Sequence, residues 1–358
     1  MPDARVLFLV PYPLGTAPSQ RFRVELFLPE LTKAGIPYSI EPFIDARTWK
    51  VLYKRGYFLS KALGLCWGFI KRWWILFARV PFYDYVFIHR ETSPLGPPIF
   101  EWIIAKIFKK RIIYDFDDAI WISNTSSANH FINWLKASWK VKHICRWAYK
   151  ITAGNDYLYH YAIQFNQKVI KIPTCVDIEK GSHEIKRHRE GILSVGWTGS
   201  HSTLKYLDQI IPVINELQKE IDFNFLVIAD KNPFLPLRNF QFIPWNSSTE
   251  QEDLLKLDIG VMPLVADAWS EGKCGFKLIQ YYAGGIPAVA SPVGINKIIV
   301  EHEVNGFLCD TNVEWKFSLG KLLANKFLRE QMGDRGRKKI SREYSLQSQT
   351  IKFIELFS

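Results

Sequence analysis

Apolar and polar residues along the chain form short apolar runs that alternate with longer stretches of helical period. Nine of these runs are typical of β-strands, and they lie at 5–10, 83–90, 111–116, 149–154, 168–173, 191–197, 223–230, 257–263 and 286–291. Apolar runs of this length that are separated by helices indicate parallel strands covered on both faces. Two such sets in series predict an α/β protein with two Rossmann-like, doubly wound domains.

A polar and charged stretch without a strand pattern, Val176–Gly191, separates the two sets of predicted strands. Domain boundaries fall in such segments. We therefore predict a first domain over residues 1–177, a linker over 178–191, a second domain over 192–340 and a C-terminal helix over 341–358.

The size of the chain agrees with two domains, because 358 residues exceed what one hydrophobic core usually serves. No stretch approaches the ~18 uncharged apolar residues that a membrane-spanning helix requires. The start, MPDARVLFLV, lacks the basic segment and the longer apolar run of a signal peptide. The five cysteines are far apart and form no C-x-x-C pair, which is typical of reduced thiols in a cytoplasmic protein.

Charge is distributed unequally along the chain. Residues 1–180 contain 25 Lys and Arg against 14 Asp and Glu, whereas residues 181–358 contain 21 of each type. The whole net charge of +11 therefore belongs to the first half. An excess of this kind favours a partner with negative charge.

Ligands of open α/β sheets bind at the carboxyl ends of the strands. After the run at 191–197 comes a loop that contains Gly199, Ser200, Ser202 and Thr203, and a helix is expected to begin near Thr203. Ser202 or Thr203 would cap this helix, whose free N–H groups could bind a phosphate. The alternative is an ordinary turn with a serine cap and no ligand.

The segment EGKCGFK, 271–277, has features that suit a diphosphate. Gly272, Gly275 and Phe276 offer backbone at close range, and Lys273 and Lys277 bring two cationic groups to the same place. A diphosphate requires such donors and cations because its charges are costly to strip of water. The alternative is that both lysines are ordinary solvated surface residues.

At this point the sequence resembles a known family. The segment KLIQYYAGGIPAVASPVGINKIIVEHEVNGFL, 277–308, resembles the nucleotide-sugar segment of the group 1 (family 4) retaining glycosyltransferases of the GT-B fold. Residues 10–36, 170–180 and 196–207 resemble, in this order, the start of the acceptor domain, its closing segment and the start of the donor domain. The resemblance implies two domains that face each other across a cleft and a C-terminal helix that crosses back to the first domain.

The resemblance also implies roles for single residues of the second domain. The family's second glutamate, which holds the ribose hydroxyl groups, falls on Gln280, whose amide still donates and accepts hydrogen bonds. The first glutamate falls on Gly272, with Glu271 one position out of register. The Arg and Lys that often follow the first strand of the donor domain are missing, so Lys273 and Lys277 are the predicted diphosphate cations.

Residues of the first domain are the predicted acceptor site. Gly15 and Arg21 follow its first strand, and we expect Arg21 to reach the cleft while Arg23 is solvated. The carboxylates of Asp115, Asp117 and Asp118 follow another strand; they could bind sugar hydroxyl groups, hold a cation or cap a helix.

The segment IHRE, 88–91, also follows a strand. Its Arg90 and Glu91 could pair across the cleft, whereas His89 suits a satisfied core histidine better than a ligand. The resemblance implies that lysines, arginines and helix ends serve the diphosphate, and no metal or other cofactor is expected. The nucleotide diphosphate sugar itself would be the donor substrate.

Residues 54–82 interleave basic side chains with tryptophans and other apolar residues. This composition suits the headgroup region of an anionic bilayer, and the alternative is a buried helix whose basic residues end at the surface. Nucleic acid is not expected as a partner, because no binding motif or basic stripe along one helix is present.

Taken together, the sequence predicts a cytoplasmic glycosyltransferase, peripheral at the inner face of the cell membrane, that acts with retention on a saccharide or lipid-linked acceptor. Such an enzyme would serve the synthesis of cell-surface polysaccharide or glycolipid. The rival hypothesis is a catalytically weak or inactive relative that binds a nucleotide sugar or assists an assembly. Gly272 and Gln280, in place of two glutamates, favour this rival.

Overall fold

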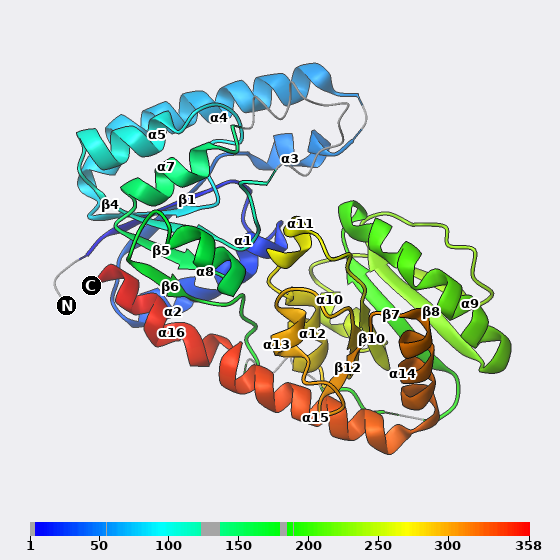
Figure 1. Cartoon of the computed structure of the whole chain (residues 1–358). Coiled ribbons are helices and arrows are strands. Elements are labelled where there is room, and N and C mark those ends of the chain that lie inside the picture. The colour runs from blue at the N-terminus through cyan, green and yellow to red at the C-terminus, as the bar shows by residue number, and fades with distance from the viewer. Residues whose placement is uncertain (1–3, 55, 123–136, 180–184, 189) are drawn as a thin grey trace. The chain divides into compact units, whose positions relative to one another are not determined.

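The computed structural model of the protein describes residues 4–54, 56–122, 137–179, 185–188 and 190–358 (Figure 1). It divides into two compact units, of which the first comprises Met1–Thr174 with Gln349–Ser358 and the second Cys175–Ser348. Parts of the predicted linker, 180–184 and 189, and Arg55 of the predicted membrane segment lie outside the described residues.

The first unit is built on a parallel six-stranded sheet in the order β2-β1-β3-β4-β5-β6. Its strands are β1 (Val6–Val10), β2 (Tyr38–Pro42), β3 (Tyr85–His89), β4 (Arg111–Phe116), β5 (Lys150–Ala153) and β6 (Val169–Lys171). Every residue of β1 and β3 is buried, because helices cover both faces of these central strands. The register aligns Val6 with both Tyr38 and Tyr85.

Helices connect these strands. They are α1 (Pro18–Arg23), η1 (Glu25–Phe27), α2 (Leu28–Lys33), α3 (Ala46–Leu52), α4 (Phe58–Ala78), η2 (Val80–Phe82), α5 (Ile99–Trp102), the π-helical turn η3 (Ile103–Ile107), α7 (Lys140–Trp147) and α8 (Asp156–Ala162). The long helix α4 approaches its neighbours closely through two glycines. A Cβ atom would lie 2.1 Å from Thr48 Oγ1 at Gly64 and 2.7 Å from Phe43 Cε1 at Gly68.

The second unit has a parallel six-stranded sheet in the order β12-β11-β10-β7-β8-β9. Its strands are β7 (Leu193–Gly199), β8 (Phe223–Ala229), β9 (Phe240–Pro244), β10 (Ile259–Met262), β11 (Ala288–Ala290) and β12 (Gly306–Leu308). Its helices are η5 (His201–Gln209), α9 (Ile211–Glu220), α10 (Glu250–Leu254), α11 (Ala268–Glu271), α12 (Phe276–Ala283), α13 (Asn296–Ile299), α14 (Asn312–Ala324) and α15 (Lys326–Glu343).

The core of the second unit follows the alternation of side chains along its strands. Val195 and Trp197 of β7 and Phe225 of β8 belong to one buried cluster with residues of α9 and α14. The other face of the sheet is covered in part by α12, where the ring of Tyr281 lies so close to Gly260 that a Cβ atom there would be 2.4 Å from the ring. Both sheets thus have the two-faced burial that the apolar runs predict.

The last helix, α16 (Leu346–Ile354), and the turn η6 (Glu355–Phe357) end in the first unit. Phe353 stacks on Phe27 with ring centroids 4.2 Å apart, and Phe357 contacts Phe8 and Tyr85. Lys150 Nζ donates to the carbonyl oxygen atoms of Glu355 and Leu356 at the end of the chain. The predicted fold class, two Rossmann-like domains with a C-terminal helix that returns to the first, is confirmed.

Candidate functional site

The carboxyl end of β7 leads directly into the 3-10 helix η5. This helix begins at His201, so the predicted start near Thr203 is wrong, and so is the predicted cap by Ser202 or Thr203. Ser200 occupies the N-cap position without a side-chain cap bond. The hydroxyl groups bond locally instead: Ser200 Oγ lies 2.8 Å from Ser202 Oγ, and Thr203 Oγ1 donates to the Ser200 carbonyl at 3.0 Å.

This start is explained by a carboxylate that the sequence analysis did not select. Asp230 follows β8, and it accepts a hydrogen bond from the backbone N–H of His201 at 2.6 Å. The ring of His201 adds a second contact, with Nδ1 at 2.5 Å from Asp230 Oδ2. Because Asp230 already takes this backbone donor, no hydroxyl group is required as a cap.

Lys277 lies against the end of β7. Its ammonium group is 5.2 Å from the centroid of the Trp197 ring, a distance at which a cation is attracted to the face of an indole. Gly199 makes room for this arrangement, because a Cβ atom there would be 2.4 Å from Trp197 Cη2 and 2.9 Å from Lys277 Cε. The structure therefore brings Gly199 and Lys277 together.

Lys273 contacts the same region through a different pair of rings. Its ammonium group lies 6.0 Å from the ring centroid of Tyr206, on η5, and 5.6 Å from that of Trp269, on α11. The Tyr206 hydroxyl is 3.2 Å from Ser270 Oγ, which joins the two elements. Lys273 and Lys277 are both half-buried, so the fully solvated alternative does not describe them.

The turn between α11 and α12 depends on Gly275. Its φ is +66°, and a Cβ atom there would lie 2.4 Å from Ile299 Cδ1, so both conformation and space require glycine. Helix α12 begins directly after it at Phe276. Glu271 is the last residue of α11 and is half-buried. Its backbone packs against Gly294, where a Cβ atom would be 3.0 Å from the Glu271 carbonyl oxygen.

Gln280 has an acidic neighbour that the sequence did not indicate. Its Nε2 donates to Oε1 of Glu250 at 3.2 Å, and Glu250 is the first residue of α10. The indole N–H of Trp245 donates to the same oxygen at 3.1 Å. A carboxylate therefore stands beside the position where the resembling family has its second glutamate. The contact between Gln280 and Glu250 could not be predicted from local sequence, because the two residues are far apart in the chain.

At the carboxyl edge of the first sheet, Asp115 is the centre of a buried polar network. It forms an ion pair with Arg23, and it accepts from Thr152 Oγ1 at 2.6 Å. His89 Nδ1 lies 2.7 Å from Asp115 Oδ2, and His89 Nε2 lies 3.0 Å from Ser19 Oγ. The prediction that Arg23 is solvated is wrong, because the buried carboxylate requires its charge.

The electrostatics of this network fix its protons. Burial alone would raise the pKa of Asp115, but the charge of Arg23 and the hydrogen bond with His89 outweigh this effect and hold the pKa below the ordinary 3.8. An ionised carboxylate only accepts, so His89 Nδ1 is the donor to Asp115. When the His89 ring is neutral, its Nε2 accepts from the hydroxyl group of Ser19. The histidine is buried, as expected for a core residue, but it joins α1 to two strand ends.

A second charged cluster surrounds Arg90. Its guanidinium group donates to Asp117 Oδ1 at 2.9 and 2.7 Å and to Asp118 Oδ2 at 2.5 Å. Burial would raise the pKa of Asp117, but Arg90 overcomes this effect and holds it well below its usual range. Arg90 thus pairs with two aspartates inside the first unit. Glu91, which was also expected to pair across the cleft, lies 2.7 Å from Lys140 Nζ in the same unit.

The backbone of Arg90 has a φ of +62°, which is uncommon for a residue with a side chain. Its N–H donates to the Asp115 carbonyl at 2.7 Å, and its own carbonyl accepts from the Tyr114 hydroxyl at 2.9 Å. These bonds hold the left-handed conformation and aim the side chain at the aspartates. Strained residues of this kind gather at functional sites.

The other predicted acceptor residues lie nearer the end of β1. Gly15 has a φ of +75°, and its N–H donates to Glu25 Oε2 at 2.9 Å. Arg21 is half-buried, with its guanidinium carbon 4.9 Å from the centroid of the Phe22 ring. Arg23, from the same helix as Arg21, joins the Asp115 network.

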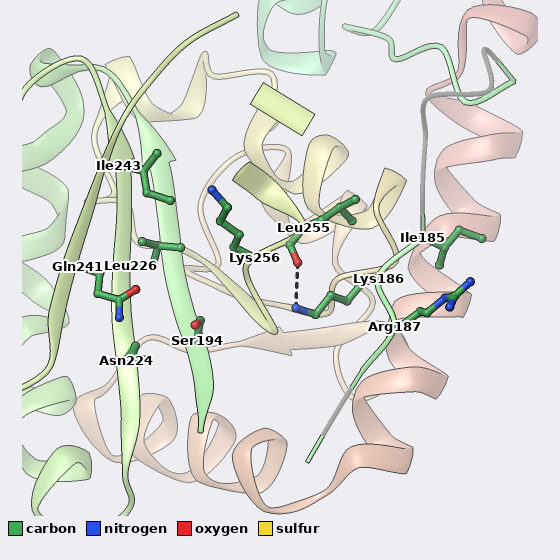
Figure 2. Close-up of a pocket in the computed structure, with 10 residues that line it drawn as sticks. All are labelled: Ile185, Lys186, Arg187, Ser194, Asn224, Leu226, Gln241, Ile243, Leu255 and Lys256. Carbon is green, nitrogen blue, oxygen red and sulfur yellow. Dashed lines mark hydrogen bonds between the residues drawn. The ribbon is translucent and has the colours of Figure 1, made fainter. Parts of the chain in front are cut away.

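Among the described residues, no group of three or more His, Cys, Asp and Glu side chains could hold a metal ion. A hollow of about 1130 Å³ lies in the second unit (Figure 2). It is lined by Ser194, Asn224 and Gln241 from the early parts of β7, β8 and β9, and Lys186 donates to the Leu255 carbonyl at 2.9 Å beside it. It contains none of the predicted site residues.

Comparison with known proteins finds a family model that matches most of the second unit. Residues 190–325 match the sequence model of the family "Glycosyl transferases group 1". A comparison with curated protein sequences finds no match. Solved structures that resemble almost the whole chain include the following three, all of which are distant in sequence.

Sucrose-phosphate synthase from Thermosynechococcus elongatus has a TM-score of 0.71 at 12% identity, over 99% of this chain and 98% of its own. A glycosyltransferase from Rickettsia africae has a TM-score of 0.70 at 12% identity, over 100% of this chain and 98% of its own. HepE from Anabaena, solved with UDP and glucose, has a TM-score of 0.67 at 13% identity, over 99% of each chain. Residues 190–325 are therefore a group 1 glycosyltransferase domain, in a chain that has the GT-B fold.

Proposed function

We propose that the protein transfers a sugar from a nucleotide diphosphate sugar to a saccharide or lipid-linked acceptor. The donor binds at the carboxyl edge of the second sheet. The observation that carries this proposal is the contact between Lys277 and the end of β7, where Gly199 leaves room for the lysine. HepE, which was solved with UDP and glucose, has a similar fold and supports the choice of donor.

The chemistry follows from the charges that develop during transfer. When the bond between sugar and diphosphate breaks, negative charge grows on the departing phosphate oxygen atoms. The ammonium groups of Lys273 and Lys277 are fixed by aromatic rings before the substrate arrives, so they stabilise this charge with little reorganisation. The turn from Gly199 to Thr203 and the backbone of Gly275 and Phe276 supply further donors to the diphosphate.

The nucleoside is placed by Gln280 together with Glu250. The side-chain amide and the neighbouring carboxylate offer both a donor and acceptors to the ribose hydroxyl groups. The hypothesis of an inactive binder rests partly on the replacement of a glutamate by Gln280. The carboxylate of Glu250 beside Gln280 weakens that argument. Glu271, at the end of α11, is the proposed contact to the transferred sugar.

The acceptor is held by the first unit. Arg90 and Asp118, both half-buried, form with the buried Asp117 a set of donors and acceptors that suits sugar hydroxyl groups. Arg21 and Gly15 extend this surface at the end of β1. We further propose that transfer occurs with retention and without a metal ion, and that it serves cell-surface polysaccharide or glycolipid synthesis.

A donor-hydrolysis assay tests the proposal. The purified protein is incubated with UDP-, GDP- and ADP-sugars, and release of free nucleoside diphosphate is measured with and without simple saccharide acceptors. Turnover of one donor that is lost in Lys273→Ala and Lys277→Ala, but kept in the exposed Lys219→Ala control, supports the enzyme. Binding of a nucleotide sugar without turnover, for every donor and acceptor tried, supports the inactive binder instead.

A further inference from the structure

The outward face of α4 carries a stripe of exposed apolar side chains. Its six members are each between 56% and 73% exposed: Leu59, Leu63, Trp67, Ile70, Trp74 and Phe77. They recur at intervals of three and four residues, which places them on one side of a helix. Helices at the surface of water-soluble proteins usually show polar residues on this side.

The inward face of α4 is fixed by different residues. Gly64 and Gly68 allow close approach to Thr48 and Phe43, and Ile75 and Leu76 are buried. Arg72 is buried as well, and it donates to the carbonyl groups at the ends of β1 and β2 and in the loop after β3. Burial lowers the pKa of Arg72 to about 10, and it remains charged at neutral pH. The orientation of the helix is therefore set, and the apolar stripe must face outward.

The apolar surface continues onto the neighbouring helices. Ile99 and Trp102 of α5 and Ile107 of η3 are 45%, 44% and 58% exposed. Trp73 of α4, which is 40% exposed, joins them through Phe100, whose ring centroid is 4.9 Å away. We call these side chains the α4 patch: the six of the stripe with Trp73, Ile99, Trp102 and Ile107. Contiguous apolar surfaces of this extent mark sites of interaction.

Positive charge predominates around the α4 patch. Residues 46–83 contain eight Lys and Arg and no Asp or Glu. Lys50 and Lys54 are exposed before α4, and Lys106 and Lys109 are exposed at and after η3. By contrast, Lys71 and Arg79 of α4 itself both pair with Glu41 of β2. The apolar patch is thus bordered by cationic side chains.

Among the described residues, no helix is long and apolar enough to cross a membrane. From the patch and its charged border, we propose that α4 lies in the surface of an anionic lipid bilayer, with the apolar patch in the headgroup and acyl boundary. Trp67, Trp73, Trp74 and Trp102 suit this depth, because the indole is apolar with one polar N–H group. The cationic border meets the negative lipid headgroups.

A second copy of the chain is a poorer occupant. In a two-fold dimer the same patch of both copies would meet, and the cationic borders would be brought together without acidic partners. A bilayer provides the missing negative charge on the same surface that accepts the tryptophans. This proposal rests on residues of the first unit alone and does not depend on the proposed sugar transfer.

Flotation of the full chain with vesicles tests the proposal. Vesicles of phosphatidylcholine alone and of phosphatidylcholine with phosphatidylglycerol are compared at low and high salt. We expect binding to the anionic vesicles, with a blue shift of tryptophan emission. In Trp67→Ser/Trp74→Ser/Phe77→Ser the partition coefficient should fall about tenfold or more, because apolar burial drives insertion. The matched control is Phe234→Ser/Phe317→Ser/Phe327→Ser, which changes three side chains of the second unit that are even more exposed.

A charge variant distinguishes electrostatic attraction to anionic lipid from non-specific hydrophobic adsorption. In Lys50→Glu/Lys106→Glu/Lys109→Glu, binding at low salt should fall by about fivefold or more for each lysine, since a basic residue near the surface contributes roughly 1 kcal/mol. Lys219→Glu/Lys231→Glu/Lys352→Glu has the same net charge and changes exposed lysines elsewhere. It should keep most of the binding.

Several results would overturn the proposal. One is absence of binding to either kind of vesicle. Another is binding that is equal for neutral and anionic vesicles. A third is a dimer in sedimentation velocity that the serine variant converts to a monomer, which would assign the patch to a second copy. Nucleotide-induced thermal shifts of the same variants should equal those of the wild type, so that a failure here is distinct from a failure of the donor site.

Discussion

Lys277 lies over the indole ring of Trp197, with 5.2 Å between its ammonium nitrogen and the ring centroid. The two residues come from α12 and β7, and their contact fixes a cation at the carboxyl edge of the second sheet. A lysine held in this way loses less side-chain freedom when an anion binds than a free lysine would. The indole ring of Trp197 therefore positions the ammonium group, and this arrangement requires both side chains.

Lys277→Ala should weaken nucleoside diphosphate binding by about tenfold or more, which corresponds to about 1.4 kcal/mol. The reason is the loss of a charge-assisted contact to phosphate. Isothermal titration calorimetry with UDP, GDP and ADP measures the change, with Lys219→Ala as the control. Equal affinities in the two variants would show that Lys277 does not touch the nucleotide.

Gly199→Ala should disturb the contact between Lys277 and Trp197, because Gly199 packs against both side chains. The added Cβ would be 2.4 Å from Trp197 and 2.9 Å from Lys277, so side chains must move. We expect a loss of about 1–3 kcal/mol in the free energy of unfolding, together with weaker nucleotide binding. The matched control is Gly320→Ala on α14, where a Cβ would meet nothing closer than 3.9 Å. This control should stabilise the helix slightly, and urea denaturation compares the two variants.

Gln280→Glu tests why this chain has an amide at that position. The new carboxylate would stand about as close to Glu250 as the amide does now, at 3.2 Å, and the two like charges would repel. We expect nucleotide affinity to fall in the single variant and to recover in Gln280→Glu/Glu250→Gln, which exchanges the two groups. Calorimetric titration measures both. A single variant that binds better than the wild type would contradict a shared role for the pair.

The strands that the sequence analysis missed are β2, β9 and β12. All three are at sheet edges, where one side of the strand lacks a neighbour. Every residue of β2 is half-buried, and β9 has three half-buried and two exposed residues, whereas β12 is mostly buried but only three residues long. An edge strand therefore needs fewer apolar residues than a central one, and a search for continuous apolar runs passes over it. The central strands were predictable because both of their faces are covered.

The predicted site shows a similar division. Lys273, Lys277 and Gly199 could be selected because glycines and lysines near a strand end are a local signal. Asp230, Glu250 and Ser19 could not be selected, because each contributes through a partner that is distant along the chain. Arg23 was misjudged for the same reason: its burial depends on Asp115, 92 residues later. Local patterns locate an edge of a sheet, whereas the pairing of charges there is a property of the fold.

Asp115→Asn should strongly destabilise the first unit and change its response to acid. The substitution leaves the buried Arg23 without its counter-charge, and breaking a buried pair in this way costs about 3–5 kcal/mol. The exposed pair of Lys171 and Asp156 is the control, because Asp156→Asn should cost about 0–1 kcal/mol. Guanidinium denaturation at neutral pH, followed by fluorescence, compares the two variants.

The pH dependence has a defined sign. The pKa of Asp115 is lower in the folded protein than its ordinary 3.8, so the unfolded chain binds the proton more readily. The stabilisation is complete above 3.8 and is lost as the pH falls below 3.8 and through the lowered value. The wild type should therefore lose stability over this acidic range more steeply than Asp115→Asn, which has no carboxyl group to titrate there. Parallel acid-unfolding curves for the two proteins would show that Asp115 is not held ionised by Arg23 and His89.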